Sequence, residues 1–552
     1  MEENRISRLS LFAILIVLLL SILTVSGLSR DAAAALGTNS EDMTSGTFTT
    51  YLPITSSVTT RTNCRYGSSH PFDKKLTNPW LRVIGSGHYI NFAGGPSGPP
   101  VPESIEHIGL IRTKQEFQNG RRLPSFTVYP ELKMTGDGLG PKVLANPGKL
   151  WLVGNEVDVN HINQDNIYPD LYAQAYHEVY HFIKDLDPNA HVAIAGLSMM
   201  TPGRLQYLDI VWDTYLKKYG EPMPVDVWNM HLYILSEIRP WDNGPSDGKI
   251  ALGTDPALAI KAPFGDPKLV CPKDDVYCRA EHDDLSIFRD QVVALRIWMK
   301  EHGQQNKPLI LSEFGQLYPF LDYDDPANPT KCFLMDEFGQ CFTQSRVTSF
   351  MQKTTDFMET AKDPNLGYPA DDFRLVQHWT WFSLWTEPDT SGGSSNMLKD
   401  NYLQISPGSV TALNQIGLAY RDKIAASELT YNLVAGEARD VTAKASGGTA
   451  DVELAAGFYN NGSGGIDDIF SVTFYTDENL TQVIGETKVI PRATGLINGC
   501  SWGRISDWAS FTWTEVPVGT HNYWVKVDSH NSIKVEDSEK DNVAMGKVTI
   551  VP

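Results

Sequence analysis

The sequence has no excess of positive charge. Its 552 residues include 46 Lys and Arg against 66 Asp and Glu, which gives a formal net charge of -20 at pH 7. A chain with this balance repels nucleic-acid phosphates and anionic lipid headgroups, so we expect no nucleic-acid partner. The hydrophobic content of 41% is ordinary for a globular protein. The length exceeds what one core usually organises, so we expect a large domain and a smaller one.

Three kinds of ligand-binding pattern are also missing. Gly85-Ser86-Gly87 is too short, and wrongly flanked, to be a phosphate-binding loop. The acidic residues Asp322, Asp324 and Asp325 lack the regular spacing of calcium ligands, which favours a solvated loop. No cysteine has the tight Cys and His spacing typical of zinc sites. We therefore expect neither a cofactor nor a metal.

Cysteines are few. Cys64 and Cys500 have no partner nearby in the sequence, and they either pair across the two domains or stay as buried thiols. The other four lie in two close pairs that favour small disulfide loops, as expected of an exported protein. These pairs are Cys271 with Cys278 and Cys332 with Cys341.

Only one long apolar run stands out, and it lies near the N-terminus. Arg5 and Arg8 precede the uncharged stretch Leu9 to Val25, and the small residues Ala32 to Ala35 follow it. We interpret residues 1–35 as a signal peptide or a retained N-terminal anchor that tethers the protein to a membrane or cell surface. Either interpretation predicts an exported protein, extracellular or on the cell surface. No cysteine follows the run, which excludes a lipid-attachment site of the bacterial lipoprotein kind.

A Ser- and Thr-rich linker, residues 36–62, precedes a region of alternating strand and helix patterns, residues 63–425. Apolar residues at helical spacing predict helices over Pro169 to Leu186 and Ser286 to His302. The alternation indicates an α/β domain built on parallel strands. Strand-like runs are found at Leu81 to Phe92, Ser125 to Tyr129, Leu150 to Gly154, His191 to Leu197, Val225 to Tyr233, Pro308 to Ser312 and Leu375 to Leu384.

These seven runs favour an eight-stranded (β/α)8 TIM barrel with loop insertions over a doubly wound sheet. The placement of polar and aromatic side chains supports this prediction. They lie at the carboxyl ends of the predicted strands, where a barrel gathers its catalytic groups. The residues concerned are Glu156, His231, Tyr233, Glu313 and Trp381.

Residues 430–552 lose the helical periodicity. Segments such as Phe470 to Tyr475 and His521 to Val527 alternate between apolar and polar residues, and Asn-Gly and Gly-Gly turns separate such segments. This pattern predicts a smaller all-β domain, an immunoglobulin-like sandwich.

Two glutamates carry the chemistry. Glu156 ends the run Trp151-Leu-Val-Gly-Asn155-Glu156, and Glu313 ends the apolar run that begins at Pro308. Two carboxylates delivered by separate buried strands suit the cleavage of a glycosidic bond. For Glu156 alone, a charge at a helix N-terminus is the alternative interpretation. Gly315, two residues after Glu313, leaves room for a ligand to approach the backbone.

The chain resembles the retaining glycoside hydrolases of clan A, the TIM-barrel catalytic-core domains of many secreted proteins. The resemblance covers about Arg82 to Leu384, and one departure is Val157, where family members commonly have Pro. The order of the motifs along the chain is more specific than any one of them. They are Gly154-Asn-Glu-Val-Asp158, Leu171-Tyr-Ala-Gln-Ala-Tyr-His-Glu178, Asp187-Pro-Asn-Ala-His191 and Leu311-Ser-Glu-Phe-Gly315.

The resemblance implies a retaining double displacement. Glu156 is then the acid and base, Glu313 is the nucleophile, and Asn155 holds the 2-hydroxyl of the sugar. His231-Leu-Tyr233 is similar to the His-x-Tyr of several clan members, which orients the nucleophile and lines the subsite. A histidine beside apolar residues is otherwise more often an ordinary core residue. Among three tryptophans near the last strand, Trp381 best matches the family's aromatic platform for sugars.

The C-terminal region resembles the CARDB domain, a cell-adhesion-related bacterial module. The resemblance rests on the segment Val527 to Asn542, which carries the pattern of Asp528, Glu536, Glu539 and Asn542 near the end of the domain, and on the early turn Asn460-Asn-Gly462. Such modules usually act as spacers or adhesion units.

The sequence therefore predicts an exported glycoside hydrolase that cleaves β-glycosidic bonds of a poly- or oligosaccharide. The alternative is a noncatalytic cell-surface protein that binds carbohydrate or mediates adhesion on a degenerate barrel. The long insertions Ser236 to Asp283 and Tyr318 to Phe342 carry no recognisable pocket pattern, so the sugar and linkage are not predicted.

Overall fold

The computed structural model describes residues 62–69, 78–96, 101–102, 104–235, 237, 250–258, 276–277, 279–317, 320, 331–336, 338–387, 393–491, 498–533 and 535–552. Within these ranges, no helix has the length and apolar character needed to span a membrane. Several predictions fall outside the described residues. They concern the N-terminal apolar run, the linker before Thr62, the Cys271 and Cys278 pair, and the acidic residues Asp322, Asp324 and Asp325.

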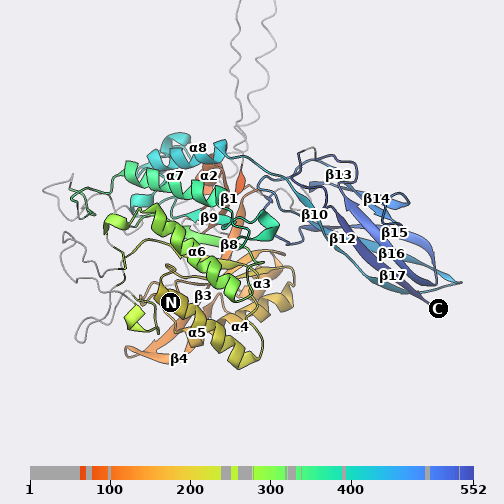
Figure 1. Ribbon diagram of the computed structural model, residues 1–552, viewed down its shortest axis with the longest axis horizontal. Helices are drawn as coiled ribbons and strands as arrows, with labels where there is room; N and C mark the ends of the chain where they lie inside the picture. Colours follow the sequence, from red (N-terminus) through yellow and green to blue (C-terminus); the bar gives the residue numbers. More distant parts are fainter. Residues whose placement is uncertain are drawn as a thin grey trace, which may run out of the picture. The chain divides into compact units, whose positions relative to one another are not determined.

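Eight parallel strands form a nearly closed barrel (Figure 1). The hydrogen-bonded order is β6-β5-β3-β2-β1-β9-β8-β7. Two isolated parallel bridges, Ala193 to Val227 and Leu197 to Met230, link β6 to β7. The predicted eight-stranded barrel is therefore confirmed. The strands are β1 (Asn63–Ser69), β2 (Ser86–Ile90), β3 (Glu106–Gln118), β5 (Leu150–Asn155), β6 (His191–Gly196), β7 (Trp228–Leu232), β8 (Leu309–Phe314) and β9 (His378–Trp381).

Helices cover the barrel strands with their apolar faces. In α4 (Pro169–Leu186), Tyr172, Val179 and Ile183 are fully buried in the same core cluster as side chains of the strands. This helix has the predicted bounds, with a proline at its start. The predicted helix near Ser286 is α6, which the Asp284 side chain caps by accepting a hydrogen bond from Ser286 N (2.7 Å). The helices also include α2 (Asn78–Ile84), α3 (Leu139–Leu144), α5 (Pro202–Tyr219), α6 (Leu285–Glu301), α7 (Gln344–Thr360) and α8 (Gln415–Ala426).

Two predicted barrel strands are wrong in part. The run Leu81 to Phe92 is divided, because α2 extends to Ile84 and β2 begins only at Ser86. Gly85 has a φ of 87°, a conformation that ends the helix at low steric cost. The run Ser125 to Tyr129 belongs to β4 (Arg121–Tyr129), which pairs antiparallel with the outer part of β3 and is not a barrel strand.

Two barrel strands, β1 and β3, were not predicted. β1 is fully buried although its sequence, Asn-Cys-Arg-Tyr-Gly-Ser-Ser, has no apolar run. Polar pairs inside the fold explain this: Arg65 forms an ion pair with Asp371, and His88 reaches across Gly67. A Cβ on Gly67 would lie 2.0 Å from His88 Nε2, so only glycine leaves space for that ring.

The C-terminal region forms two sheets around one apolar core. One sheet has the order β10-β12-β15, and the other has the order β11-β17-β16-β13-β14. Leu454, Phe458, Phe474 and Val525 are fully buried in the shared core. The predicted all-β region is therefore confirmed. Its strands are β10 (Leu433–Ala438), β11 (Val441–Lys444), β12 (Thr449–Asn460), β13 (Phe470–Tyr475), β14 (Val483–Val489), β15 (Asp507–Pro517), β16 (Gly519–Val527) and β17 (Val543–Val551).

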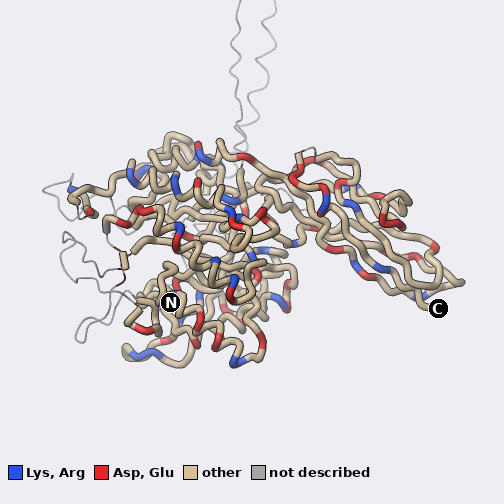
Figure 2. The backbone as a smooth tube through the Cα atoms, in the orientation of Figure 1, with Lys and Arg blue, Asp and Glu red and all other residues tan. Residues whose placement is uncertain are grey.

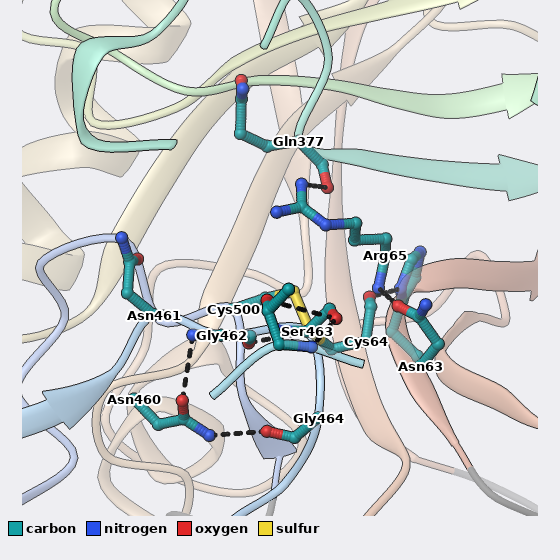
Figure 3. Close-up of a disulfide and its surroundings, with 12 residues drawn as sticks. Asn63, Cys64, Arg65, Gln377, Asn460, Asn461, Gly462, Ser463, Gly464 and Cys500 are labelled. Carbon is teal, nitrogen blue, oxygen red and sulfur yellow. Dashed lines mark hydrogen bonds between the residues drawn. A yellow bond between two sulfur atoms is a disulfide. The ribbon is translucent and has the colours of Figure 1, made fainter. Parts of the chain in front are cut away.

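A disulfide joins the barrel to the β region (Figure 3). Cys64 in β1 pairs with Cys500, which resolves the alternatives left open by the sequence in favour of a disulfide. Backbone hydrogen bonds flank it, from Cys64 N to Ser463 O (3.0 Å) and from Cys500 N to Gly462 O (2.8 Å). The predicted disulfide between Cys332 and Cys341 is also confirmed.

Charged residues are spread over both parts of the chain (Figure 2). Lys and Arg are interspersed with Asp and Glu along the backbone, and the picture shows no extended basic stretch in the described part of the chain. The absence of a nucleic-acid partner stays a prediction that rests on this balance.

Candidate active site

The two predicted catalytic glutamates lie at the carboxyl ends of the fourth and seventh barrel strands. Glu156 follows β5 directly, and its backbone N–H donates to Gly196 O on the neighbouring strand (3.0 Å). Its φ of 44° is unusual for a residue with a side chain, as at many functional sites. Glu313 lies in β8. The two residues are only 9% and 6% exposed, so neither carboxylate is freely solvated.

His231 lies between the two glutamates. Its Nδ1 is 3.2 Å from Glu156 Oε1, and its Nε2 is 3.4 Å from Glu313 Oε1. A Cβ on Gly196 would lie 2.2 Å from the imidazole Cδ2, so glycine at the end of β6 makes room for the ring. The structure therefore places His231 in the site, in contact with both carboxylates.

Tyr233 contacts the predicted nucleophile. Its hydroxyl donates to Glu313 Oε2 over 2.8 Å, and the residue is 3% exposed. Burial first, and then Glu313 and Glu156, raise the pKa of Tyr233 well above its usual value. The phenol therefore stays protonated and remains a donor. A hydrogen bond of this kind fixes the orientation of a carboxylate and favours its charged form.

The site retains protons near neutral pH. Burial raises the pKa of Glu313 to about 7, with Glu156 adding to the rise while His231 and the Tyr233 hydroxyl oppose it. Burial lowers the pKa of His231, but Glu313 and Glu156 outweigh it and the net direction is upward. The cause is two acids beside one imidazole in a poorly solvated space.

Oxygens of the two glutamates and a nitrogen of His231 all lie within 4.8 Å of one another. Such a set has the composition to hold a metal ion. However, the two ring nitrogens face different carboxylates, so a hydrogen-bonded carboxylate–imidazole–carboxylate chain accounts for the arrangement without an ion.

Asn155 lies beside Glu156 and is held firmly. Its Nδ2 donates to Gln164 Oε1 (2.8 Å), which leaves its second N–H for another acceptor. Its backbone N–H donates to Asp165 Oδ2 (2.9 Å), and the same oxygen accepts from Thr113 N (2.7 Å). Asp165 also forms an ion pair with Arg112. Sequence reasoning missed Asp165, because its partners on β3 lie about 50 positions away.

A second buried network was also missed. Asp158, the last residue of the Gly154 to Asp158 motif, is fully buried and forms an ion pair with Arg204. Arg204 Nε pairs with Glu237 Oε1 (3.0 Å), which in turn accepts from Thr201 Oγ1 (2.6 Å). This network fixes the segment just after Glu156. No helix begins at Glu156, so its alternative interpretation as a helix N-terminal charge is wrong.

The predicted aromatic platform, Trp381, does not face the site. It has no exposed surface, its ring packs edge-on against Phe314 (5.1 Å), and its Nε1 donates to Ser395 O (2.7 Å). Side chains alternate along a strand, so the next residue, Phe382, points the other way and packs edge-on against Tyr233 (6.2 Å). Phe382 directly follows β9 and is partly exposed, so an aromatic ring other than Trp381 contacts Tyr233 in the site.

The space at Gly315 is also filled by the protein. A Cβ at this position would lie 2.8 Å from Phe382 O and 3.0 Å from Ser395 Oγ. The expectation that a ligand approaches the backbone there is therefore wrong. Glycine is needed for packing between the end of β8 and the segments after β9.

No protein-family model matches the sequence, and no curated protein matches it. Among solved structures, a GH128 subgroup I endo-β-1,3-glucanase from Amycolatopsis mediterranei, in complex with laminaritriose, is 14% identical. The match covers 65% of this chain and 98% of that one, with a TM-score of 0.36. A GH128 subgroup VII oligosaccharide-binding protein from Cryptococcus neoformans is 11% identical over 67% of this chain and 97% of that one, again with a TM-score of 0.36.

A third similarity concerns the C-terminal region. The CARDB domain of a Pyrococcus furiosus protein, in complex with di-metal ions, is 21% identical over 22% of this chain and 93% of that domain, with a TM-score of 0.16. All three values of identity are low.

Proposed function

We propose that the chain is a retaining glycoside hydrolase that acts on β-linked poly- or oligosaccharides. One observation carries the proposal: two buried glutamates at the ends of β5 and β8 bring oxygens within 4.8 Å of each other. Retaining glycosidases need carboxyl groups about 5 to 5.5 Å apart, whereas inverting enzymes need about 6.5 to 9.5 Å to admit a water between them. The separation supports retention.

In the first step, Glu156 protonates the leaving oxygen while Glu313 attacks the anomeric carbon. In the second, Glu156 accepts a proton from water, which displaces Glu313 and releases the sugar. Tyr233 holds the attacking carboxylate by its hydrogen bond to Oε2. Asn155 has one N–H left for the 2-hydroxyl of the sugar, a bond that strengthens in the transition state.

His231 contacts both carboxyl groups and can pass a proton from Glu313 to Glu156. The raised pKa of Glu313 means that the free protein keeps a proton on the nucleophile side, whereas the first step needs it on Glu156. The imidazole contacts Glu313 through Nε2 and Glu156 through Nδ1. Nε2 can take the proton from Glu313 while Nδ1 releases one to Glu156, which leaves the ring neutral and both carboxyl groups ready to react.

Two further proposals concern location and the β region. The basic residues and apolar run near the N-terminus support export to the cell surface or the extracellular space, with cleavage or tethering. The two-layer β region, residues 430–552, is proposed to be an immunoglobulin-like spacer or adhesion unit following a catalytic domain of residues 63–425.

The test is turnover by the purified chain on aryl β-glycosides and on β-linked polysaccharides such as laminarin, xylan and mannan. Release of aryl alcohol or reducing sugar supports the enzyme and begins to name the sugar. The competing function is noncatalytic carbohydrate binding, which the deep burial of both glutamates makes less favourable. Tight binding to a polysaccharide with no release of product across the whole panel would contradict the proposal.

The hydrolysis rate should fall as the pH rises above about 7. The reaction needs one proton on the glutamate pair, and burial raises the pKa of Glu313 to about 7, so the pair holds this proton below that pH. Above it, the rate should drop about tenfold per pH unit as this single proton is lost. The measurement is kcat/KM for an aryl β-glycoside between pH 4 and about 9. A rate that keeps rising above pH 7 would contradict this assignment.

A further inference from the structure

The hairpin of β3 and β4 is a basic arm in an acidic chain. It extends past the barrel (Figure 1), and its residues 112–129, here called the basic arm, include four Lys and Arg against one Glu. The whole chain, in contrast, has a formal net charge of -20. A local excess of one charge attracts ligands of the opposite sign. The four cations are Arg112, Lys114, Arg121 and Arg122.

Arg112 connects the basic arm to the candidate active site. Its guanidinium forms an ion pair with Asp165, and Asp165 also accepts from the backbone N–H of Asn155 (2.9 Å). Burial raises the pKa of Glu313 to about 7, and Arg112 is among the groups that oppose this rise. The positive charge of Arg112 therefore acts within the site, and the arm begins at its edge.

Lys114 has no carboxylate partner. It is two residues beyond Arg112 along β3, so both side chains project from the same face of the hairpin. Among the described residues, no Asp or Glu forms an ion pair with Lys114. Burial lowers the pKa of its ammonium, and Arg112 adds to the fall while Asp165 opposes it. An anionic group bound between the two cations would offset this repulsion.

Tyr129 adds an aromatic surface to the same face. It is the direct register partner of Arg112, so the two side chains project from one side of the hairpin. The residue is 66% exposed. An aromatic ring stacks on the apolar face of a sugar, and cations beside it bind anionic substituents. This face of the arm therefore suits a sugar ring that carries a negative charge.

We propose that the β-linked polysaccharide is acidic and that its carboxylate or sulfate groups bind Arg112 and Lys114 on the basic arm. The proposal rests on the proposed hydrolase function, because the arm holds the part of the polysaccharide that continues outward from the two glutamates. A neutral polysaccharide leaves the ammonium of Lys114 without a counter-charge. The arm therefore discriminates between acidic and neutral chains of the same linkage.

The test is calorimetric binding of matched oligosaccharides to Glu313→Gln, a variant expected to leave them uncleaved. One pair is an oligomer of β-1,4-glucuronan and the neutral cello-oligosaccharide of equal length. The other is a chondroitin oligosaccharide and its carboxyl-reduced form, and sulfated chondroitin separates sulfate from carboxylate recognition. An acidic member should bind about tenfold more tightly than its neutral counterpart, and the preference should shrink in about 0.5 M NaCl, because salt screens exposed charges.

A second set of variants locates the anion. On the Glu313→Gln background, Lys114→Gln should weaken binding of the acidic oligosaccharide about fivefold and leave the neutral one unchanged, whereas Lys114→Arg should retain the preference. Lys114 is partly exposed, and its Nζ donates to a backbone carbonyl, Ile162 O (3.3 Å), so the change does not endanger folding. The matched control is Lys353→Gln, at an exposed lysine of α7, which should bind both members as before.

Equal affinity for the acidic and neutral members of both pairs would overturn the proposal. An undiminished preference in Lys114→Gln would also overturn it, because the anion would then be held elsewhere. Incubation of the same oligosaccharides with the native chain tests the hydrolase separately. Cleavage of the neutral members alone supports the hydrolase and overturns the acidic substrate. Acid-selective binding without any cleavage supports recognition by the basic arm and contradicts the hydrolase.

Discussion

Glu313→Gln is expected to lose nearly all hydrolysis. The variant keeps the size of the side chain and its contact with the Tyr233 hydroxyl, but it has no carboxylate to attack the anomeric carbon. Removing the covalent nucleophile of an enzyme costs about 10⁴-fold or more in kcat. The measurement is kcat and KM on the best substrate of the panel. KM should change much less than kcat, because the other side chains of the site are intact.

Glu178→Gln is the matched control for this variant. Glu178 is an exposed residue of α4, and its replacement should leave kcat unchanged. If Glu313→Gln keeps more than about a tenth of the native rate, the nucleophile lies elsewhere. Circular dichroism and thermal unfolding of both variants separate a loss of chemistry from a loss of structure.

The second large effect is expected for Glu156→Gln, and it depends on the leaving group. In the proposed mechanism Glu156 protonates the departing oxygen, so the variant should lose about 10² to 10⁴-fold in kcat on polysaccharides, whose leaving groups need a proton. Aryl glycosides have a phenol as the leaving group, and an acidic phenol departs readily without being protonated. The first step should therefore stay fast on these substrates. The covalent intermediate should then accumulate, because no base activates water, and a burst of phenol should precede slow turnover.

Azide distinguishes the roles of the two glutamates. In Glu156→Gln, azide attacks the intermediate without a base and should give a β-glycosyl azide. In Glu313→Ala, it occupies the place of the nucleophile and should give an α-glycosyl azide. The opposite pair of products would show that the two roles are exchanged, an assignment that the raised pKa of Glu313 makes worth testing.

The sequence predicted those parts of the fold where a local pattern reflects burial. Helix α4 was located to the residue because its apolar spacing and its initial proline both mark it. Strands β5 and β8 were found from their apolar runs, and the glutamates at their ends followed. Strand β1 was missed because its buried face is filled by polar pairs, such as Arg65 with Asp371, that only the folded chain brings together.

The sequence pointed to the two glutamates, His231 and Tyr233, which the structure brings together, but it did not point to the residues that hold them in place. Asp165 and Arg204 hold the segments around Glu156, but their partners are distant in sequence and no local pattern marks them. Trp381 was chosen among the three tryptophans near the last strand because it best matches the family's aromatic platform, whereas in the structure Phe382 is the residue that contacts Tyr233. Register at a strand end depends on pairing with neighbouring strands, which composition does not reveal.

The anomeric configuration of the first product tests the proposed retaining mechanism most directly. Proton NMR during hydrolysis of a β-glycoside by the purified chain distinguishes the two anomers before mutarotation mixes them. A retaining double displacement by Glu156 and Glu313 predicts that the β anomer appears first. Initial release of the α anomer would contradict the account, because it requires direct attack by water in place of Glu313.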